Sequence, residues 1–126
     1  MGGFMLKKHR VRESNFSENL EVKKKNNIEV SVEGGILIPK ALSDSNKNIV
    51  VQLKFQIGGK DERLYLQLET LSSFEPENSM SEITEEIARK ECLPVALAQL
   101  RKTVKKVTEA YGMPSLDLPP FEEENL

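Results

Sequence analysis

Residues 49–68 read IVVQLKFQIGGKDERLYLQL, and this stretch decides the fold class. In both halves apolar and polar residues alternate, which is typical of a strand with one buried face and one wet face. The apolar set is Ile49, Val51, Leu53, Phe55, Ile57, Leu64, Leu66 and Leu68. Gly58-Gly59-Lys60-Asp61 between the halves is typical of a hairpin connection. Two such strands predict an antiparallel sheet rather than a βαβ unit.

The alternation also extends upstream of this stretch. Residues 28–38 again place apolar residues at every second position, which predicts a further strand ended by Pro39. Gly34-Gly35 inside that strand predicts a bulge or a sharp bend. Residues 1–25 are basic and weakly patterned, and only residues 4–6 there indicate the beginning of a short strand.

Downstream of the strands the pattern becomes helical. Ser79-Met80-Ser81-Glu82 is a capping-box pattern, so a helix should begin there. Pro94 should break this helix and open a second, longer one, which Gly112 should end. The sequence therefore predicts an α+β domain, a sheet followed by a long helix with a break at Pro94.

The longer helix carries a narrow apolar seam with alternating spacings of three and four. The seam residues are Leu97, Leu100, Val104 and Val107. Such a seam ordinarily serves the core, but its regularity also fits subunit pairing, and we predict a homo-oligomer, at least a dimer.

Residues 113–126 form an extended, Pro-rich and acidic tail that still carries large apolar residues. Such a segment either finds an apolar surface or exposes one, and both outcomes favour a binding module. We treat residues 1–126 as one domain, because 126 residues suit a single core.

Composition excludes several classes of protein. Hydrophobic residues make up 38% and charged residues 30%, and the net charge of −2 offers no global basic field for nucleic acid. No apolar run approaches the roughly 20 residues of a membrane helix. The basic N-terminus is not followed by an apolar stretch, so it is not a secretory signal, and we expect a cytoplasmic protein.

Residues that could carry catalysis are sparse. His9 is the only histidine and should be a surface residue, while Cys92 should be a small buried hydrophobe. Neither a phosphate-binding loop nor metal-ligand spacing occurs, so we expect no cofactor, no metal and no enzymatic activity. A small nucleic-acid-binding protein using the basic residues of 101–106 stays an alternative, although clustered aromatic residues and helix-turn-helix spacing are missing.

Leu93-Pro94 opening a long helix, Gly112 ending it, and the segment Met113-Pro114-Ser115-Leu116-Asp117-Leu118-Pro119-Pro120-Phe121 resemble the SecB family of bacterial protein-export chaperones. The family typically has a glycine, an aromatic residue and a proline there, then a Leu-x-Leu step and a further proline before a phenylalanine. The resemblance implies a four-stranded antiparallel sheet followed by a long helix. It also implies dimers or tetramers that hold unfolded preproteins in apolar grooves without ATP. Such proteins pass their clients to the SecA motor through acidic residues on the open sheet face.

This sequence departs from the family pattern at several points. Met113 replaces the usual aromatic residue, and Gln67 stands about where SecB has an acidic residue on its sheet face. SecB's second helix would lie beyond Leu126. These departures put SecA docking and tetramer formation in doubt.

The leading hypothesis is ATP-independent, chaperone-like binding of unfolded or partly folded polypeptides, with a role in protein export and with SecA as a candidate partner. A dedicated chaperone of one labile partner, such as an antitoxin, is the second hypothesis. In a SecB-like fold the sheet-to-helix loop and the tail would lie near the client groove. The predicted groove residues are Phe74, Met80, Met113, Leu116, Leu118 and Phe121, and the competing interpretation is that they are plain core.

Overall fold

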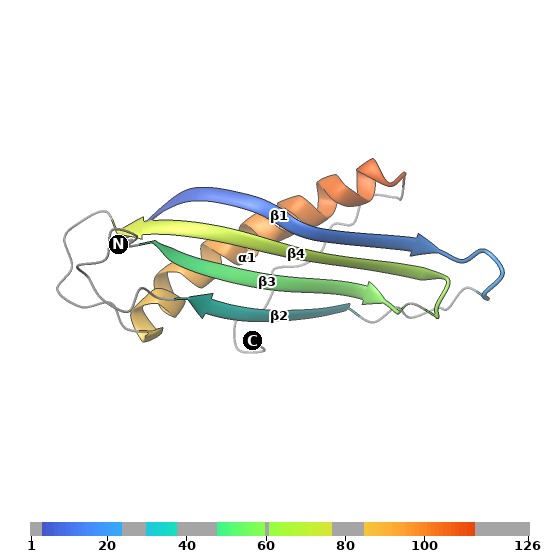
Figure 1. Cartoon of the computed structure of the whole chain (residues 1–126), viewed down its shortest axis with the longest axis horizontal. Helices are drawn as coiled ribbons and strands as arrows, with labels where there is room; N and C mark the ends of the chain where they lie inside the picture. The colour runs from blue at the N-terminus through green and yellow to red at the C-terminus, as the bar shows by residue number, and fades with distance from the viewer. Residues whose placement is uncertain (1–3, 24–29, 38–47, 60, 77–84, 113–126) are drawn as a thin grey trace.

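A computed structural model of the chain describes residues 4–23, 30–37, 48–59, 61–76 and 85–112. It contains four strands and one helix (Figure 1). The elements are β1 (Phe4–Glu18), β2 (Val30–Leu37), β3 (Ile49–Gly58), β4 (Leu64–Pro76) and α1 (Glu85–Ala110).

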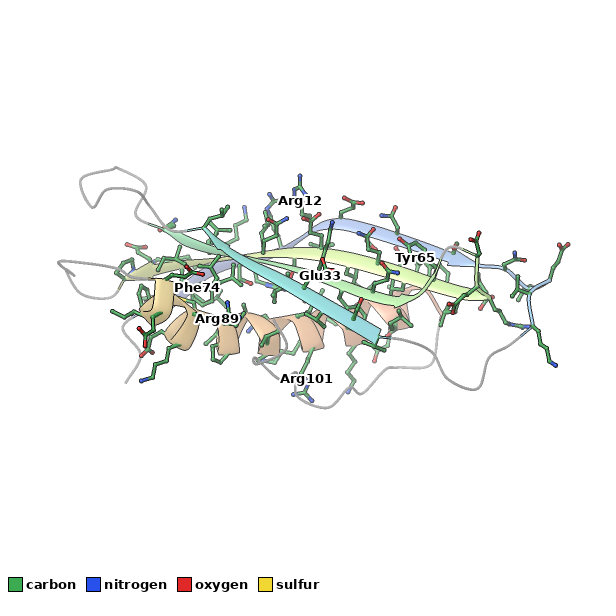
Figure 2. All side chains as sticks on the ribbon, turned by 90° about the horizontal axis from the view of Figure 1, so that it is seen from below. Arg12, Glu33, Tyr65, Phe74, Arg89 and Arg101 are labelled. Atoms are coloured by element: carbon green, nitrogen blue, oxygen red, sulfur yellow. The ribbon has the colours of Figure 1, made fainter. Side chains whose placement is uncertain are left out.

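The four strands form one antiparallel sheet in the order β1-β4-β3-β2. β2, β3 and β4 follow one another along the chain as a meander, and β1 lies beside β4, which is a Greek-key order. α1 runs obliquely across one face of the sheet and leaves the other face open (Figures 1 and 2). The predicted fold class, an antiparallel four-stranded sheet followed by a long helix, is confirmed.

The core lies between α1 and the sheet. Every second residue of β3 is buried, as the alternation predicts, and the buried face of β4 continues this layer. The core of the described residues comprises Ile49, Val51, Leu53, Phe55, Ile57, Leu66, Leu68, Phe74, Ala88, Cys92, Leu93, Ala96, Leu97, Leu100 and Val104.

The predicted subunit seam lies inside this core. Leu97, Leu100 and Val104 are buried within a single chain, and Val107 packs against the same cluster. The seam therefore serves the contact between α1 and its own sheet. It gives no support to subunit pairing, because these side chains already have their apolar partners.

The hairpin between β3 and β4 is where the sequence predicts it. Gly58 pairs with Tyr65 and has a φ of 66°, and the amide of Glu62 donates to the carbonyl of Gly59 at 2.9 Å. A Cβ at residue 58 would lie 2.0 Å from the carbonyl oxygen of Leu64, so the turn requires glycine both for its dihedral and for its space.

The prediction for the start of the chain, only the beginning of a short strand at residues 4–6, is wrong. This weakly patterned segment forms β1, a strand of 15 residues. The register of β1 with β4 shifts between Leu6 and Lys8 and again between Val11 and Glu13. Each shift moves the following side chains by one position, which hides the period of two. Gly34-Gly35, by contrast, makes no bulge, and β2 pairs with β3 without interruption.

The predicted break at Pro94 is also wrong, because α1 continues from Glu85 to Ala110 with Pro94 inside it. Buried residues on both sides of the proline, Leu93 and Ala96 among them, anchor both segments to the sheet and outweigh one missing backbone hydrogen bond. Gly112, with a φ of 79°, ends the helix as predicted. The predicted capping box at residues 79–82 lies outside the described residues.

Candidate functional site

The outer edge of β2 is the first candidate surface. β2 bonds to β3 on one side, and within the described part of the chain no strand pairs with its other side. A sheet edge presents a row of backbone donors and acceptors to any extended chain. The strand has eight residues, contains no proline and carries one charge, Glu33.

Side chains do little to shield this edge. Val30 is 46% exposed and Leu37 is 62% exposed, so apolar side chains reach the solvent at both ends of β2. In the middle, Gly34 and Gly35 are exposed, and a Cβ at Gly35 would meet nothing within 4 Å. The backbone of β2 is therefore accessible along most of its length.

The opposite edge of the sheet, β1, is different. Its two register shifts break the regular spacing of backbone groups that a new strand would need. It also carries four basic side chains, Lys7, Lys8, Arg10 and Arg12. Bulges and basic residues are devices by which proteins prevent edge-to-edge pairing. Within the described ranges, β1 is thus a protected edge of the sheet, and β2 is an unprotected one.

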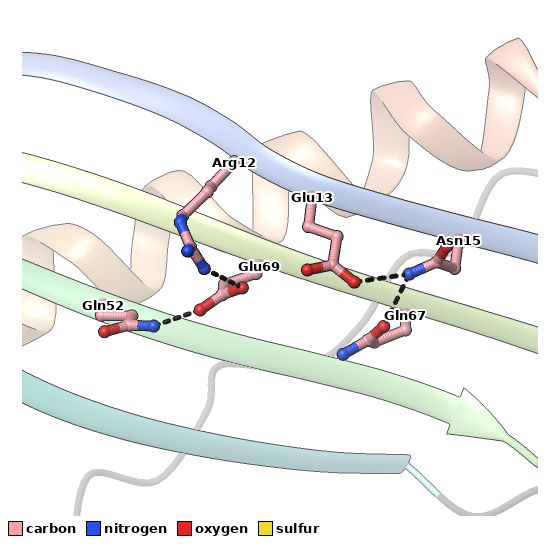
Figure 3. A network of polar contacts seen from close by, with 6 residues as sticks. All are labelled: Arg12, Glu13, Asn15, Gln52, Gln67 and Glu69. Atoms are coloured by element: carbon pink, nitrogen blue, oxygen red, sulfur yellow. Dashed lines mark hydrogen bonds and ion pairs between the residues drawn. The ribbon is translucent and has the colours of Figure 1, made fainter.

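The open face carries a polar network around Glu69, which is only 2% exposed (Figure 3). Nη1 of Arg12 lies 2.8 Å from Oε2 of Glu69, and the Gln52 amide donates to Oε1. The shift at Val11/Glu13 inserts Arg12 into β1 at this point. The Gln52 hydrogen bond and then the charges of Arg12 and Lys54 lower the pKa of Glu69, against the effect of desolvation.

A second group on the open face joins β1 to β4. The amide of Asn15 donates to Glu13 at 2.8 Å and to Gln67 at 2.9 Å (Figure 3). Gln67 is therefore a surface hydrogen-bond acceptor on the open face.

Shallow polar hollows mark the same face. One lies between β1 and β4, and two lie near β2 and β3. Their polar lining includes Glu13, Asn15, Gln67, Glu33, Gln52 and Lys54.

His9 is not the surface residue that the sequence predicts. Its ring lies between β4 and α1, with Nδ1 2.7 Å from Oγ of Ser72 and Nε2 2.8 Å from Oγ1 of Thr103. Burial lowers the pKa of His9. A hydroxyl within hydrogen-bond distance of an imidazole is the arrangement of an activated nucleophile. Here Ser72 is 0% exposed and lines none of the hollows above, so the pair is a structural clip.

Cys92 is buried, as predicted. Burial, with a smaller contribution from the charge of Glu91, raises the pKa of its thiol to about 12. The thiol is therefore protonated at neutral pH and is a poor nucleophile.

Of the predicted client-groove residues, Phe74 is the one that lies within the described residues. Phe74 is 1% exposed and pairs with Leu6 of β1 and Ile49 of β3, so it belongs to the core and not to a partly exposed groove. The other predicted groove residues, Met80, Met113, Leu116, Leu118 and Phe121, lie outside the described residues. Sequence reasoning missed the accessible edge of β2, although a strand with a Gly-Gly pair and a single charge was its visible signal.

Within the described ranges, no group of three or more His, Cys, Asp or Glu side chains could hold a metal ion. Nor is α1, the one helix described, long and apolar enough to cross a bilayer.

Comparison with known proteins shows the fold. No family model and no curated protein sequence matches this chain. Among solved structures, the chain is similar to the SecB-like chaperone Rv1957 of Mycobacterium tuberculosis, solved in complex with a ChAD peptide from the HigA1 antitoxin. The TM-score is 0.65 and the identity 16%, over 94% of this chain and 90% of that one. A protein of unknown function from Streptococcus agalactiae also matches, with a TM-score of 0.45 and 18% identity over 92% of this chain and 96% of that one. The resemblance to the SecB-like fold is thereby confirmed.

Proposed function

We propose that this protein is an ATP-independent holder of unfolded or partly folded polypeptides, and that it binds extended segments by adding them to the free edge of β2. The single observation that carries this proposal is the difference between the two sheet edges. β1 is blunted by register shifts and basic residues, whereas β2 is regular and accessible. An extended client gains main-chain hydrogen bonds there irrespective of its sequence.

The chemistry of the described residues supports a binding role over an enzymatic one. Ser72 is buried and hydrogen-bonded to the partly buried His9, and the Cys92 thiol is protonated. The similarity of the fold to that of a SecB-like chaperone also supports a binding role.

A chaperone dedicated to one labile partner is the second candidate. The observation that favours it is the similar structure from Mycobacterium tuberculosis, which was solved with a peptide from an antitoxin. A dedicated chaperone would discriminate strongly between its partner and other unfolded chains, whereas a general holder would not.

A role in protein export with transfer to SecA has less support. The resemblance to SecB implies acidic residues on the open sheet face. This chain has Glu13 and Glu33 there, but Gln67 stands at one such position and is hydrogen-bonded to Asn15, and the edge strand β1 carries Lys8 and Arg10. Assembly into a dimer or larger oligomer stays a prediction, which light scattering at tens of micromolar protein would check.

The test uses a permanently unfolded client, reduced and carboxymethylated α-lactalbumin. The double variant Val30→Lys/Gly35→Lys places lysines on the edge at two exposed positions. Its affinity for the client should fall about tenfold, equal to about 1.4 kcal/mol. The matched control is Val95→Lys, which puts a lysine on an exposed apolar position of α1 and should bind as the unchanged protein does.

Unchanged client binding by the double variant would show that the β2 edge is not the site. Absence of any binding by the unchanged protein at tens of micromolar would refute the holder function itself. A strong preference for one native partner over the unfolded client would favour the dedicated chaperone.

A further inference from the structure

A run of apolar side chains crosses the open face of the sheet beside the polar network. Leu37 of β2 lies directly opposite Val50 of β3, and Val50 lies opposite Ser73 of β4. Leu71, two residues before Ser73, is therefore the diagonal neighbour of Val50 on the same face. Leu37 is 62% exposed, and Val50 and Leu71 are partly exposed. We call Leu37, Val50 and Leu71 the open-face apolar run.

This run has no cover from the other described elements, because α1 packs on the opposite face (Figure 2). Open faces of antiparallel sheets are normally polar, since one side of such a sheet faces water. Three large aliphatic residues in adjacent positions on this side are therefore an exception that indicates an interaction surface.

Two cations border the apolar run on β1. Arg10 lies directly opposite Leu71, and Lys8 lies opposite Ser73. Both side chains are exposed, and neither forms an ion pair within the described part of the chain.

The nearby carboxylates on this face are already engaged. Glu69 accepts from Arg12 and Gln52, and Glu75 pairs with Lys7 at 3.4 Å. Lys8 and Arg10 thus stand next to an apolar surface, and neither has a carboxylate within ion-pair distance in the described part of the chain.

We propose that the open-face apolar run, together with Lys8 and Arg10, is a docking surface for an acidic amphipathic polypeptide segment of a partner protein. Such a segment buries its apolar side chains on Leu37, Val50 and Leu71 while its carboxylates pair with Arg10 and Lys8. The guanidinium of Arg10 suits a carboxylate because it offers two parallel donors.

The same features argue against nucleic acid as the occupant. The surface offers two unpaired cations, few for a phosphate backbone, and its apolar run contains no aromatic ring on which a base could stack. Phosphates would make no favourable contact with the open-face apolar run. An acidic amphipathic peptide can contact both the apolar run and the two cations. The two surfaces share Leu37, which is the last residue of β2. The inference is nevertheless independent of the proposed function, because it rests on the side chains of the open face and not on the backbone edge of β2.

The test measures fluorescence anisotropy with a labelled peptide of about 16 residues, with Leu at helical spacing and Glu at the positions between. A second peptide replaces every Glu by Lys. The Glu peptide should bind about tenfold more tightly than the Lys peptide, and its affinity should fall as salt rises.

Three variants locate the site. Lys8→Glu/Arg10→Glu should lose about tenfold in affinity for the Glu peptide and should gain affinity for the Lys peptide. Leu37→Ser should lose about fivefold, at little cost in stability because the side chain is exposed. The control Lys102→Glu/Lys105→Glu, on the exposed side of α1, should bind the Glu peptide as the unchanged protein does.

The gain of affinity for the Lys peptide also shows that the charge-reversed variant is folded. Equal binding of the two peptides, or an equal loss in the α1 control, would overturn the proposal. So would tight binding of a single-stranded RNA that Leu37→Ser leaves unchanged. If the peptide does not bind and charge reversal instead dissociates an oligomer in light scattering, the occupant is a second copy and the assignment to a partner is wrong.

Discussion

Nε2 of His9 lies 2.8 Å from Oγ1 of Thr103, although the two residues are 94 positions apart in the chain. The Thr103 hydroxyl donates its hydrogen to the carbonyl of Gln99 at 2.9 Å, so Nε2 must be the donor to Thr103. Nδ1 is then the acceptor for the hydroxyl of Ser72 at 2.7 Å. The geometry thus favours the neutral ring with its proton on Nε2, and this ring ties β1 to both β4 and α1.

This clip makes stability depend on pH. Burial lowers the pKa of His9 below 6.5, so the unfolded chain binds the proton more readily than the folded one. The contribution to stability is complete above pH 6.5 and is lost as pH falls through 6.5 toward the lowered pKa. Urea unfolding across this range should show the decline, and NMR can follow the single imidazole directly.

His9→Gln should remove most of this pH dependence, because the amide does not titrate there. His9→Ala should lower the free energy of unfolding by about 1–3 kcal/mol, since it leaves the buried Ser72 hydroxyl without its partner. Polypeptide binding should not change in either variant. A His9 pKa at or above 6.5 in the folded protein would contradict the partly buried, neutral ring.

A second prediction concerns acid unfolding and Glu69. The hydrogen bond from Gln52 is the largest influence that lowers the pKa of Glu69, and the charge of Arg12 adds to it. The ionised carboxylate therefore contributes stability above pH 4.5, and this is lost as pH falls through the lowered pKa. In the Gln52→Leu variant the pKa of Glu69 should rise more than in Arg12→Gln, so Gln52→Leu should begin to unfold at a higher pH than Arg12→Gln. Circular dichroism during an acid titration would measure both unfolding transitions.

The matched control for Glu69 is the pair of Lys7 and Glu75, whose side chains are 46% and 51% exposed. Lys7→Ala should change the free energy of unfolding by less than about 1 kcal/mol, because solvent screens an exposed pair. A larger effect for Lys7→Ala than for Gln52→Leu would refute the role given to the network around Glu69.

A third prediction compares two glycines. Gly58→Ala should cost about 2–3 kcal/mol, because the turn needs a positive φ and the new Cβ would meet the Leu64 carbonyl. Gly112→Ala has the same dihedral problem but open space around it, so it should cost about 1 kcal/mol. Thermal and urea unfolding would rank the two, and an equal cost would mean that the hairpin relaxes around the methyl group.

A fourth prediction concerns Cys92. A thiol pKa near 12 in place of 9.0 reduces the thiolate at pH 8 about a thousandfold, and burial blocks access as well. Labelling by a thiol reagent should therefore be at least that much slower in the folded protein than in urea. Rapid labelling under native conditions would show that α1 is not packed against the sheet as described.

Sequence alone predicted the regular part of the fold. β3 and the first residues of β4, 64–68, keep a period of two around a two-glycine turn, so their faces and their connection were readable. β1 was not readable beyond its first residues, because two register shifts move its apolar residues between faces. At Pro94 the sequence predicted a break that the structure does not have. The local rule that proline interrupts a helix was overridden by the packing of the residues around Pro94.

The candidate sites depend on pairing across strands, which a linear pattern does not carry. The apolar residues at positions 37, 50 and 71 share no local period, and only the strand order makes them neighbours. The same holds for Arg12, Gln52 and Glu69, which lie on three strands. For the seam of α1, the regular spacing was visible in the sequence. The sequence did not show that the partner of this seam is the chain's own sheet.

The Greek-key order has a consequence for how the chain folds during synthesis. β1 is the first strand made, yet its partner β4 is the last, so Glu18 meets Leu64 and Phe4 meets Pro76. The β2–β4 meander can close through short-range contacts, but β1 must close a loop that spans the whole meander, and loops of that length form slowly. While the ribosome adds the remaining strands, β1 is an unpaired, lysine- and arginine-rich segment. We therefore expect the basic side chains of β1 to oppose aggregation of the nascent chain until β4 has been made.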